Sequence, residues 1–192
     1  LLAISIGFGV FPFIRYPAQM AAVALIGFVG AMGYSGFGIG FKYRALGDVV
    51  VFILCGPALV IGYSLATFGR YSATHLTIGV VFGLAAVGLL HANNLNDLEV
   101  DQNRGARTIA SSLGFKRSQK YLTLIYFWIV ATLLISVIFF KVNVVFGAFA
   151  FLVYPWVAKL IQKVKNASGP LSPELAMIRF EAAQIHLAIG VS

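Results

Sequence analysis

Charged residues are scarce in this chain of 192 residues: only 10% are Asp, Glu, Lys or Arg, and only six are acidic. Because 60% of the residues are hydrophobic, a water-soluble domain of this size could not bury enough apolar surface, and the composition excludes that class. Cysteine occurs once, as Cys55, which excludes an internal disulfide framework. The apolar stretches lack a period-two alternation, which excludes an outer-membrane β-barrel.

Apolar runs of about 17–25 residues recur instead, the length that a helix needs to cross roughly 30 Å of hydrocarbon. We therefore expect an all-α membrane protein that forms one multi-span transmembrane domain over residues 1–192. The seven expected spans are the stretch up to 14, 17–35, 49–68, 74–95, 121–140, 144–160 and the stretch from 173 to the end. Both termini fall inside apolar runs, so we expect a longer protein with its N-terminal part missing here.

Positive charge is distributed unequally between the connections. The long connections at 36–48, 96–120 and 161–172, with the helix ends beside them, hold eleven of the fourteen Lys and Arg residues. Arg15, Arg70 and Lys141 lie on the other side. The positive-inside rule therefore places the long connections in the cytoplasm. The net charge of +8 reflects this topology, and we expect a lipid bilayer and no nucleic acid as partner.

A polar segment, HANNLNDLEVDQNRGART at 91–108, follows directly on the uncharged stretch 76–90. If the helix continues through 101, Asn93, Asp97 and Asp101 lie on one face at i, i+4 and i+8, with Asn94 beside them. Two carboxylates one turn apart repel each other unless a cation lies between them, and Mg²⁺ prefers such oxygen ligands and bridges them to substrate phosphate. The pattern predicts Mg²⁺-dependent binding of a diphosphate-like anion. Solvated loop residues are the alternative.

The same segment resembles a known motif. His91-Ala-Asn93-Asn94-x-x-Asp97-x-x-x-Asp101, continued by Gly105-x-Arg107-Thr108, is similar to the second aspartate-rich motif of the UbiA superfamily of intramembrane prenyltransferases. The paired asparagines and the Gly-x-Arg-Thr tail resemble its MenA branch, which makes demethylmenaquinone, and so do the stretches 34–57 and 183–190. The resemblance implies a UbiA-type bundle of nine helices, of which the seven visible spans would be the third to the ninth. The first aspartate-rich motif of the family is not in this sequence, and we expect it to precede Leu1.

The resemblance also implies an activity: transfer of a polyprenyl chain from polyprenyl diphosphate to 1,4-dihydroxy-2-naphthoate, with loss of carbon dioxide, in menaquinone biosynthesis. The implied location is a bacterial inner membrane with cytoplasmic active-site loops. The implied site residues are Asp97 and Asp101 as catalytic Mg²⁺ ligands, Asn93 and Asn94 as catalytic neighbours, Tyr34, Lys42 and Arg107 as diphosphate-binding groups, and His91 as an acceptor-positioning group.

Several alternatives stay open at this point. Lys42 is equally well explained as a positive-inside anchor, and His91 as a structural hydrogen-bonding group. Asp48 follows a glycine at the start of a span and reads as a helix N-cap. The aromatic acceptor could instead be 4-hydroxybenzoate, homogentisate or a chlorophyllide. A cation channel or transporter is disfavoured because the charges cluster at one mouth of the membrane. Prenyl chain length and oligomeric state are not encoded in any pattern that we recognise.

Overall fold

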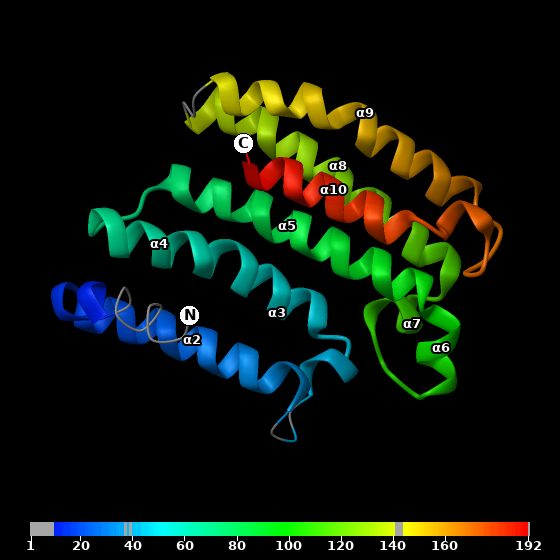
Figure 1. Cartoon of the computed structure of the whole chain (residues 1–192), viewed down its shortest axis with the longest axis horizontal. Helices are drawn as coiled ribbons and strands as arrows, with labels where there is room; N and C mark the ends of the chain where they lie inside the picture. The colour runs from blue at the N-terminus through cyan, green and yellow to red at the C-terminus, as the bar shows by residue number, and fades with distance from the viewer. Residues whose placement is uncertain (1–9, 37, 39, 141–143, 192) are drawn as a thin grey trace.

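The computed structural model describes residues 10–36, 38, 40–140 and 144–191 (Figure 1). Within these residues the chain is almost entirely helical and contains no β-strand, so the all-α prediction is confirmed. The elements are α2 (Pro17–Ser35), η1 (Phe41–Tyr43), α3 (Gly47–Ile53), η2 (Leu54–Ala58), α4 (Leu59–Phe68), α5 (Ala73–Asn96), α6 (Leu98–Asn103), α7 (Ile109–Leu113), α8 (Phe115–Phe140), α9 (Val144–Asn166), η3 (Pro173–Leu175) and α10 (Ile178–Val191).

In the part of the chain that the structure describes, four helical segments are long and apolar enough to cross a membrane: Pro17–Tyr34, Gly47–Phe68, Ala73–Asn96 and Phe115–Phe139. They confirm the spans expected at 17–35, 49–68, 74–95 and 121–140. The last two expected spans correspond to α9 and α10, which begins at Ile178 because the 3-10 turn η3 occupies the residues after Ser172. The first expected span lies largely outside the described residues.

Helix α5 is the centre of the bundle and contacts α3, α4, α8 and α10 (Figure 1). Its approach to the α3–α4 segment is close because glycines face each other. A β-carbon on Gly56 would lie 2.5 Å from the carbonyl oxygen of Gly79 and 2.7 Å from the Cα of Gly83. Gly56 belongs to η2, a π-helical turn that also contains Pro57, where the backbone leaves the regular α-helical path. Small residues therefore let two membrane helices touch through their backbones.

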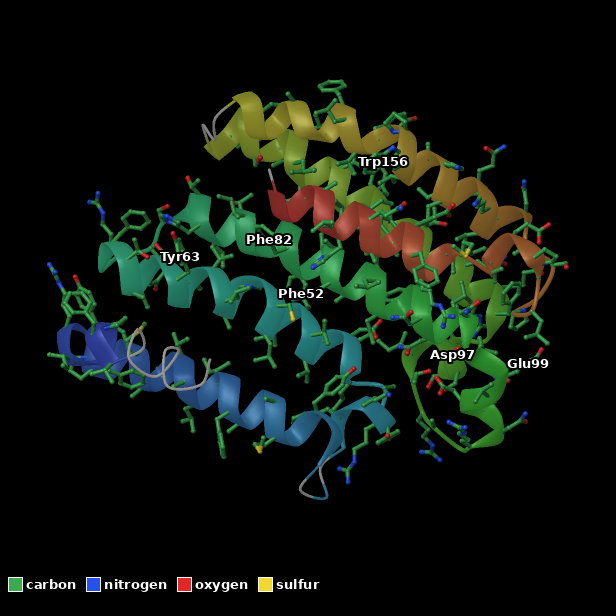
Figure 2. All side chains as sticks on the ribbon, in the orientation of Figure 1. Phe52, Tyr63, Phe82, Asp97, Glu99 and Trp156 are labelled. Carbon is green, nitrogen blue, oxygen red and sulfur yellow. The ribbon has the colours of Figure 1, made fainter. Side chains whose placement is uncertain are left out.

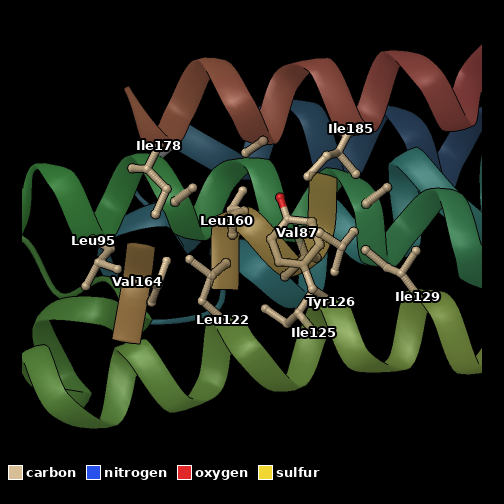
Figure 3. Packing of buried hydrophobic residues seen from close by; sticks show 14 of the residues in the cluster. Val87, Leu95, Leu122, Ile125, Tyr126, Ile129, Leu160, Val164, Ile178 and Ile185 are labelled. Carbon is tan, nitrogen blue, oxygen red and sulfur yellow. The ribbon is translucent and has the colours of Figure 1, made fainter. Parts of the chain in front are cut away.

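The apolar core lies on the other side of α5, between α5, α8, α9 and α10 (Figure 3). Val87 of α5, Tyr126 of α8, Leu160 of α9 and Ile185 of α10 are all buried there. At the ends of α8 and α9, the side-chain amide of Gln119 donates to two carbonyl oxygens near the end of α9. This packing holds the ends of α5 and α8 together, which is where the candidate site lies.

Candidate active site

The aspartate segment is not one continuous helix, so that prediction is wrong in its detail. Helix α5 ends at Asn96, Asp97 has φ −95° and ψ 11°, and α6 begins at Leu98. Short polar side chains compete for backbone hydrogen bonds and favour such helix ends. The backbone N–H of Asp97 nevertheless donates to the backbone carbonyl oxygen of Asn93 at 2.9 Å, and that of Asp101 donates to the backbone carbonyl oxygen of Asp97 at 2.8 Å. The one-turn spacing of the three residues therefore survives the break.

Asp97 and Asp101 are close enough to influence each other. Partial burial and the neighbouring Asp97 carboxylate raise the pKa of Asp101, whereas Lys42, Arg104 and a hydrogen bond with the Thr108 side chain act in the opposite direction. Lys42 comes from the connection between α2 and α3, so this connection reaches the mouth of α5. Asp97 is exposed at the end of α5 and Glu99 is exposed on α6 (Figure 2). Two mutually repelling carboxylates with basic neighbours are thus gathered at one end of the bundle.

The two connections that carry the basic residues are joined through their backbones. Arg44 and Arg107 form an isolated parallel bridge, and the N–H of Ala45 donates to the Arg107 oxygen at 2.6 Å. Between the two connections lies a cavity of about 550 Å³, lined by Tyr43, Arg44, Ala45, Gly105, Arg107 and Ser112. Arginine guanidinium groups bind phosphate oxygens in pairs of hydrogen bonds. Arg44, a basic residue of the connection at 36–48, therefore joins Arg107 as a candidate anion-binding group.

Tyr34 lies apart from this arginine-lined cavity. Its ring packs beside Gly47, where an added β-carbon would be 3.7 Å from Cε2 of the ring. Its hydroxyl interacts electrostatically with Asp48 and Tyr43. Lys42 lies near Asp101, as described above, and its ammonium group is 5.8 Å from the centroid of the Tyr43 ring. Of the residues expected to bind diphosphate, Lys42 thus lies near Asp101 and Arg107 lines the basic cavity, whereas Tyr34 packs beside Gly47 at the start of α3.

Asp48 does not act as a helix N-cap, and that prediction is wrong. The N-cap of α3 is Leu46, with no side-chain cap hydrogen bond, and Asp48 lies within the first turn. Its side chain is turned into the bundle, where it is only 3% exposed, and its Oδ2 lies 3.3 Å from Nδ1 of the fully buried His91. The charge of a buried carboxylate requires a partner, and His91 on α5 supplies it because the glycine contact brings α3 against α5.

Tyr121 of α8 completes this buried group. Its ring meets the His91 ring edge-on, with centroids 4.6 Å apart and planes at 69°, and its hydroxyl is within hydrogen-bonding reach of Asp48. The other ring nitrogen of His91, Nε2, is buried without a hydrogen-bond partner among the described residues. Sequence reasoning missed Asp48 and Tyr121. The sequence did contain a signal for the pairing of Asp48 with His91. Ionisable residues inside a membrane domain usually pair with one another, and Asp48 and His91 are two such residues.

A second cavity of about 260 Å³ opens beside this group. Asp48 and Tyr121 form its polar end, and the remaining lining is apolar: Val49, Phe52, Leu84, Val87, Leu124, Ile125 and Trp128. It lies between α3, α5 and α8. The mouth of the bundle therefore combines a basic cavity, a carboxylate pair and an apolar cavity with a buried carboxylate at its edge.

The carboxylate pair fits half of a magnesium site. Asp97 and Asp101 are hard oxygen donors whose mutual repulsion a divalent cation would relieve. Within the described residues no group of three or more His, Cys, Asp or Glu side chains is placed to hold a metal ion. Further ligands would have to come from substrate phosphate, water or residues outside this chain segment. The assignment of Mg²⁺ to these two residues stays a prediction.

Comparison with known proteins supports the family resemblance. The model of the UbiA prenyltransferase family matches residues 1–178. A similar protein, UbiA prenyltransferase domain-containing protein 1 of Gallus gallus, is 40% identical over 96 residues, which cover 50% of this chain and 28% of that protein. The Homo sapiens protein of the same name is 37% identical over 101 residues, 51% of this chain and 30% of that protein. The Drosophila melanogaster homolog is 39% identical over 101 residues, 51% of this chain and 28% of that protein.

The chain thus spans less than a third of the length of these relatives. Their names specify a UbiA prenyltransferase domain but no aromatic acceptor, prenyl chain length or metal, so they do not distinguish the MenA branch from others. They come from eukaryotes, and they give no support to a bacterial inner membrane. No solved structure matches this chain.

Proposed function

The chain belongs to the UbiA prenyltransferase family, and we propose that it transfers a polyprenyl group from polyprenyl diphosphate to an aromatic acceptor within the membrane. The observation that carries this proposal is that Asp97, Asp101 and Lys42 interact electrostatically at one end of the bundle, where Arg107 lines a basic cavity between the same two connections. Opposite charges gathered at the membrane surface suit a substrate that is apolar except for a diphosphate head. The apolar spans around the mouth suit its polyprenyl tail.

The arrangement suits a reaction in which the polyprenyl diphosphate ionises first and the aromatic ring of the acceptor then attacks the resulting carbocation. The allylic C–O bond breaks, the electron pair leaves with the diphosphate, and positive charge develops on the prenyl carbon. Lys42 and Arg107 would stabilise the departing diphosphate by electrostatic interaction. Asp97 and Asp101 would hold Mg²⁺, which when bound supplies further neutralisation of diphosphate charge. The apolar lining of the cavity beside Asp48 would keep water away from the carbocation.

The finer proposal is that the acceptor is 1,4-dihydroxy-2-naphthoate and that the product is a menaquinone precursor. The ring carbon that carries the carboxylate would form the new C–C bond, and carbon dioxide would be lost from the same carbon. Support comes from Asn93-Asn94 and from the Gly105-x-Arg107-Thr108 tail, which resemble the MenA branch. Asn94 is buried and Asn93 partly buried one turn before the aspartates, close enough to the mouth to contact a substrate there.

A competition assay tests both levels of the proposal. The complete protein, purified in detergent, would receive one polyprenyl diphosphate, Mg²⁺ and equal amounts of 1,4-dihydroxy-2-naphthoate and 4-hydroxybenzoate, and products would be separated by mass. We expect the decarboxylated prenyl naphthoquinol to predominate. Predominant prenyl-hydroxybenzoate would reject the naphthoate proposal and keep the prenyl transfer. Absence of any prenylated aromatic product, with a reference prenyltransferase active in the same detergent, would reject both.

A further inference from the structure

The buried Asp48 has more hydrogen-bonding capacity than its protein neighbours use. A carboxylate offers about four lone-pair positions, and the described partners of Asp48 are Nδ1 of His91, at 3.3 Å, and the Tyr121 hydroxyl. Among the described residues, no Lys or Arg forms an ion pair with Asp48. At 3% exposure, Asp48 must satisfy its remaining lone pairs from within the bundle, because an incompletely paired buried charge is costly.

The surroundings of Asp48 indicate what kind of group is missing. Asp48 and Tyr121 line the 260 Å³ cavity, whose other seven lining residues are apolar or aromatic. A ligand that fits must be flat or compact, apolar over most of its surface and equipped with a hydrogen-bond donor at one end. The cavity volume of about 260 Å³ lies just below the range of about 300–1,000 Å³ typical of small-molecule sites, so it suits a ring system and is too small for a long polyprenyl chain.

The cavity beside Asp48 lies near the aspartates at the end of α5. His91 of α5 precedes Asp97, the residue directly after this helix, by six residues, which is about 9 Å along the helix axis at about 1.5 Å per residue. A ring bound beside Asp48 and its partner His91 would therefore lie about 9 Å from Asp97 along the α5 axis. Part of the cavity wall is also open to the membrane, since Val49 is 50%, Leu124 51% and Trp128 47% exposed. An apolar acceptor could enter from the lipid.

We infer that this cavity between α3, α5 and α8 binds the hydroxylated ring of the aromatic acceptor, with Asp48 accepting a hydrogen bond from a ring hydroxyl. The inference rests on the proposed prenyl transfer and adds an acceptor site to it. His91 and Tyr121 are positioning residues, because each lies within hydrogen-bonding reach of the Asp48 carboxylate. A hydroxyl that donates to a carboxylate also releases electron density into the ring, which favours attack on a carbocation.

The test measures the KM of each substrate separately in the complete, purified protein. Asp48→Asn keeps the side-chain size and removes the charge. It should raise the KM for the hydroxylated acceptor about tenfold or more, as expected for a lost hydrogen bond to a charged group, and leave the KM for polyprenyl diphosphate unchanged. Glu174→Gln, which changes an exposed acid far along the chain, is the matched control. An unchanged acceptor KM in Asp48→Asn, with active wild type, would overturn the inference alone.

An acceptor analogue distinguishes contact from a merely structural role. Methylation of the ring hydroxyl should lower kcat/KM strongly in the wild type but by a much smaller factor in Asp48→Asn, because the hydrogen bond is already absent. Equal factors in both proteins would show that Asp48 does not contact that hydroxyl and would refute the assignment. If the wild type prenylates no aromatic compound at all, the proposed function fails first, so the two failures are distinguishable.

A second pair of variants covers the case in which Asp48→Asn does not fold. Leu124→Trp should fill the cavity from its lipid-facing wall and raise the acceptor KM, without touching the buried pair. Ile138→Trp places the same ring at a 71% exposed position of the same helix and should leave both KM values unchanged. An unchanged acceptor KM in a folded Leu124→Trp protein would reject the cavity as the acceptor site.

Discussion

Replacing Gly56 with alanine should separate the α3–α4 segment from α5. The added methyl group would lie 2.5 Å from the carbonyl oxygen of Gly79 and 2.7 Å from the Cα of Gly83. Optimal separation of non-bonded heavy atoms is about 3.5–4 Å, so the two segments would have to move apart by about 1 Å. Because the opposing atoms belong to the backbone of α5, no side-chain rotation can relieve the overlap.

Overpacking of this kind costs about 1–3 kcal/mol. Gly27 provides a matched control, because it lies within α2 and a β-carbon there would meet nothing within 4 Å. Alanine in a helix interior is favoured over glycine by about 0.5–1 kcal/mol, so Gly27→Ala should be neutral or stabilising. The two substitutions are chemically identical, and only their surroundings differ.

Thermal unfolding in one detergent, followed by the loss of the monodisperse peak in size-exclusion chromatography, would measure both variants. For a chain of this size 1 kcal/mol corresponds to about 2–4 °C in Tm, so Gly56→Ala should unfold several degrees below the wild type and Gly27→Ala at or above it. An unchanged Tm for Gly56→Ala would refute the backbone contact between η2 and α5. It would also weaken the pairing of Asp48 with His91, which depends on that contact.

Asp97→Ala and Asp101→Ala should each abolish Mg²⁺-dependent prenyl transfer in a folded, extractable protein; undiminished turnover of either would remove it from the metal site. The pKa of Asp101 is raised in the folded state, so ionisation of this carboxyl group opposes folding. Without metal, the free energy of unfolding should therefore fall as the pH rises from the ordinary pKa of an aspartate through the raised pKa of Asp101 in the folded protein. Asp101→Asn should therefore raise the metal-free Tm at neutral pH and reduce the stabilisation given by added Mg²⁺; a Tm unchanged in both conditions would contradict this. Single cysteines can be placed at the exposed positions Asn103 and Tyr71 in a Cys55→Ser background. An impermeant thiol reagent applied outside should label the cysteine at 71 and not the one at 103. Labelling of the cysteine at 103 alone would show that the predicted topology is inverted.

Composition and periodicity were sufficient to predict much of this protein. The scarcity of charge and the length of the apolar runs indicated membrane-spanning helices, and four of them are present at the expected places. The spacing of Asn93, Asp97 and Asp101 predicted a shared helical face, and the one-turn spacing persists across the break at Asp97. Such features are local: they depend on hydrophobicity and on contacts between residues three or four apart, which a sequence displays directly.

Only the tertiary structure revealed which distant residues meet. Asp48 and His91 are 43 residues apart in the chain, and Arg44 and Arg107 meet across two connections. Pairing of this kind depends on how closely α3 approaches α5, and that distance is set by Gly56, Gly79 and Gly83, whose lack of side chains permits contact between backbones. A glycine in a sequence does not state which helix it will face. The spans were therefore predictable from local chemistry, whereas the buried carboxylate and its cavity arise from packing between helices.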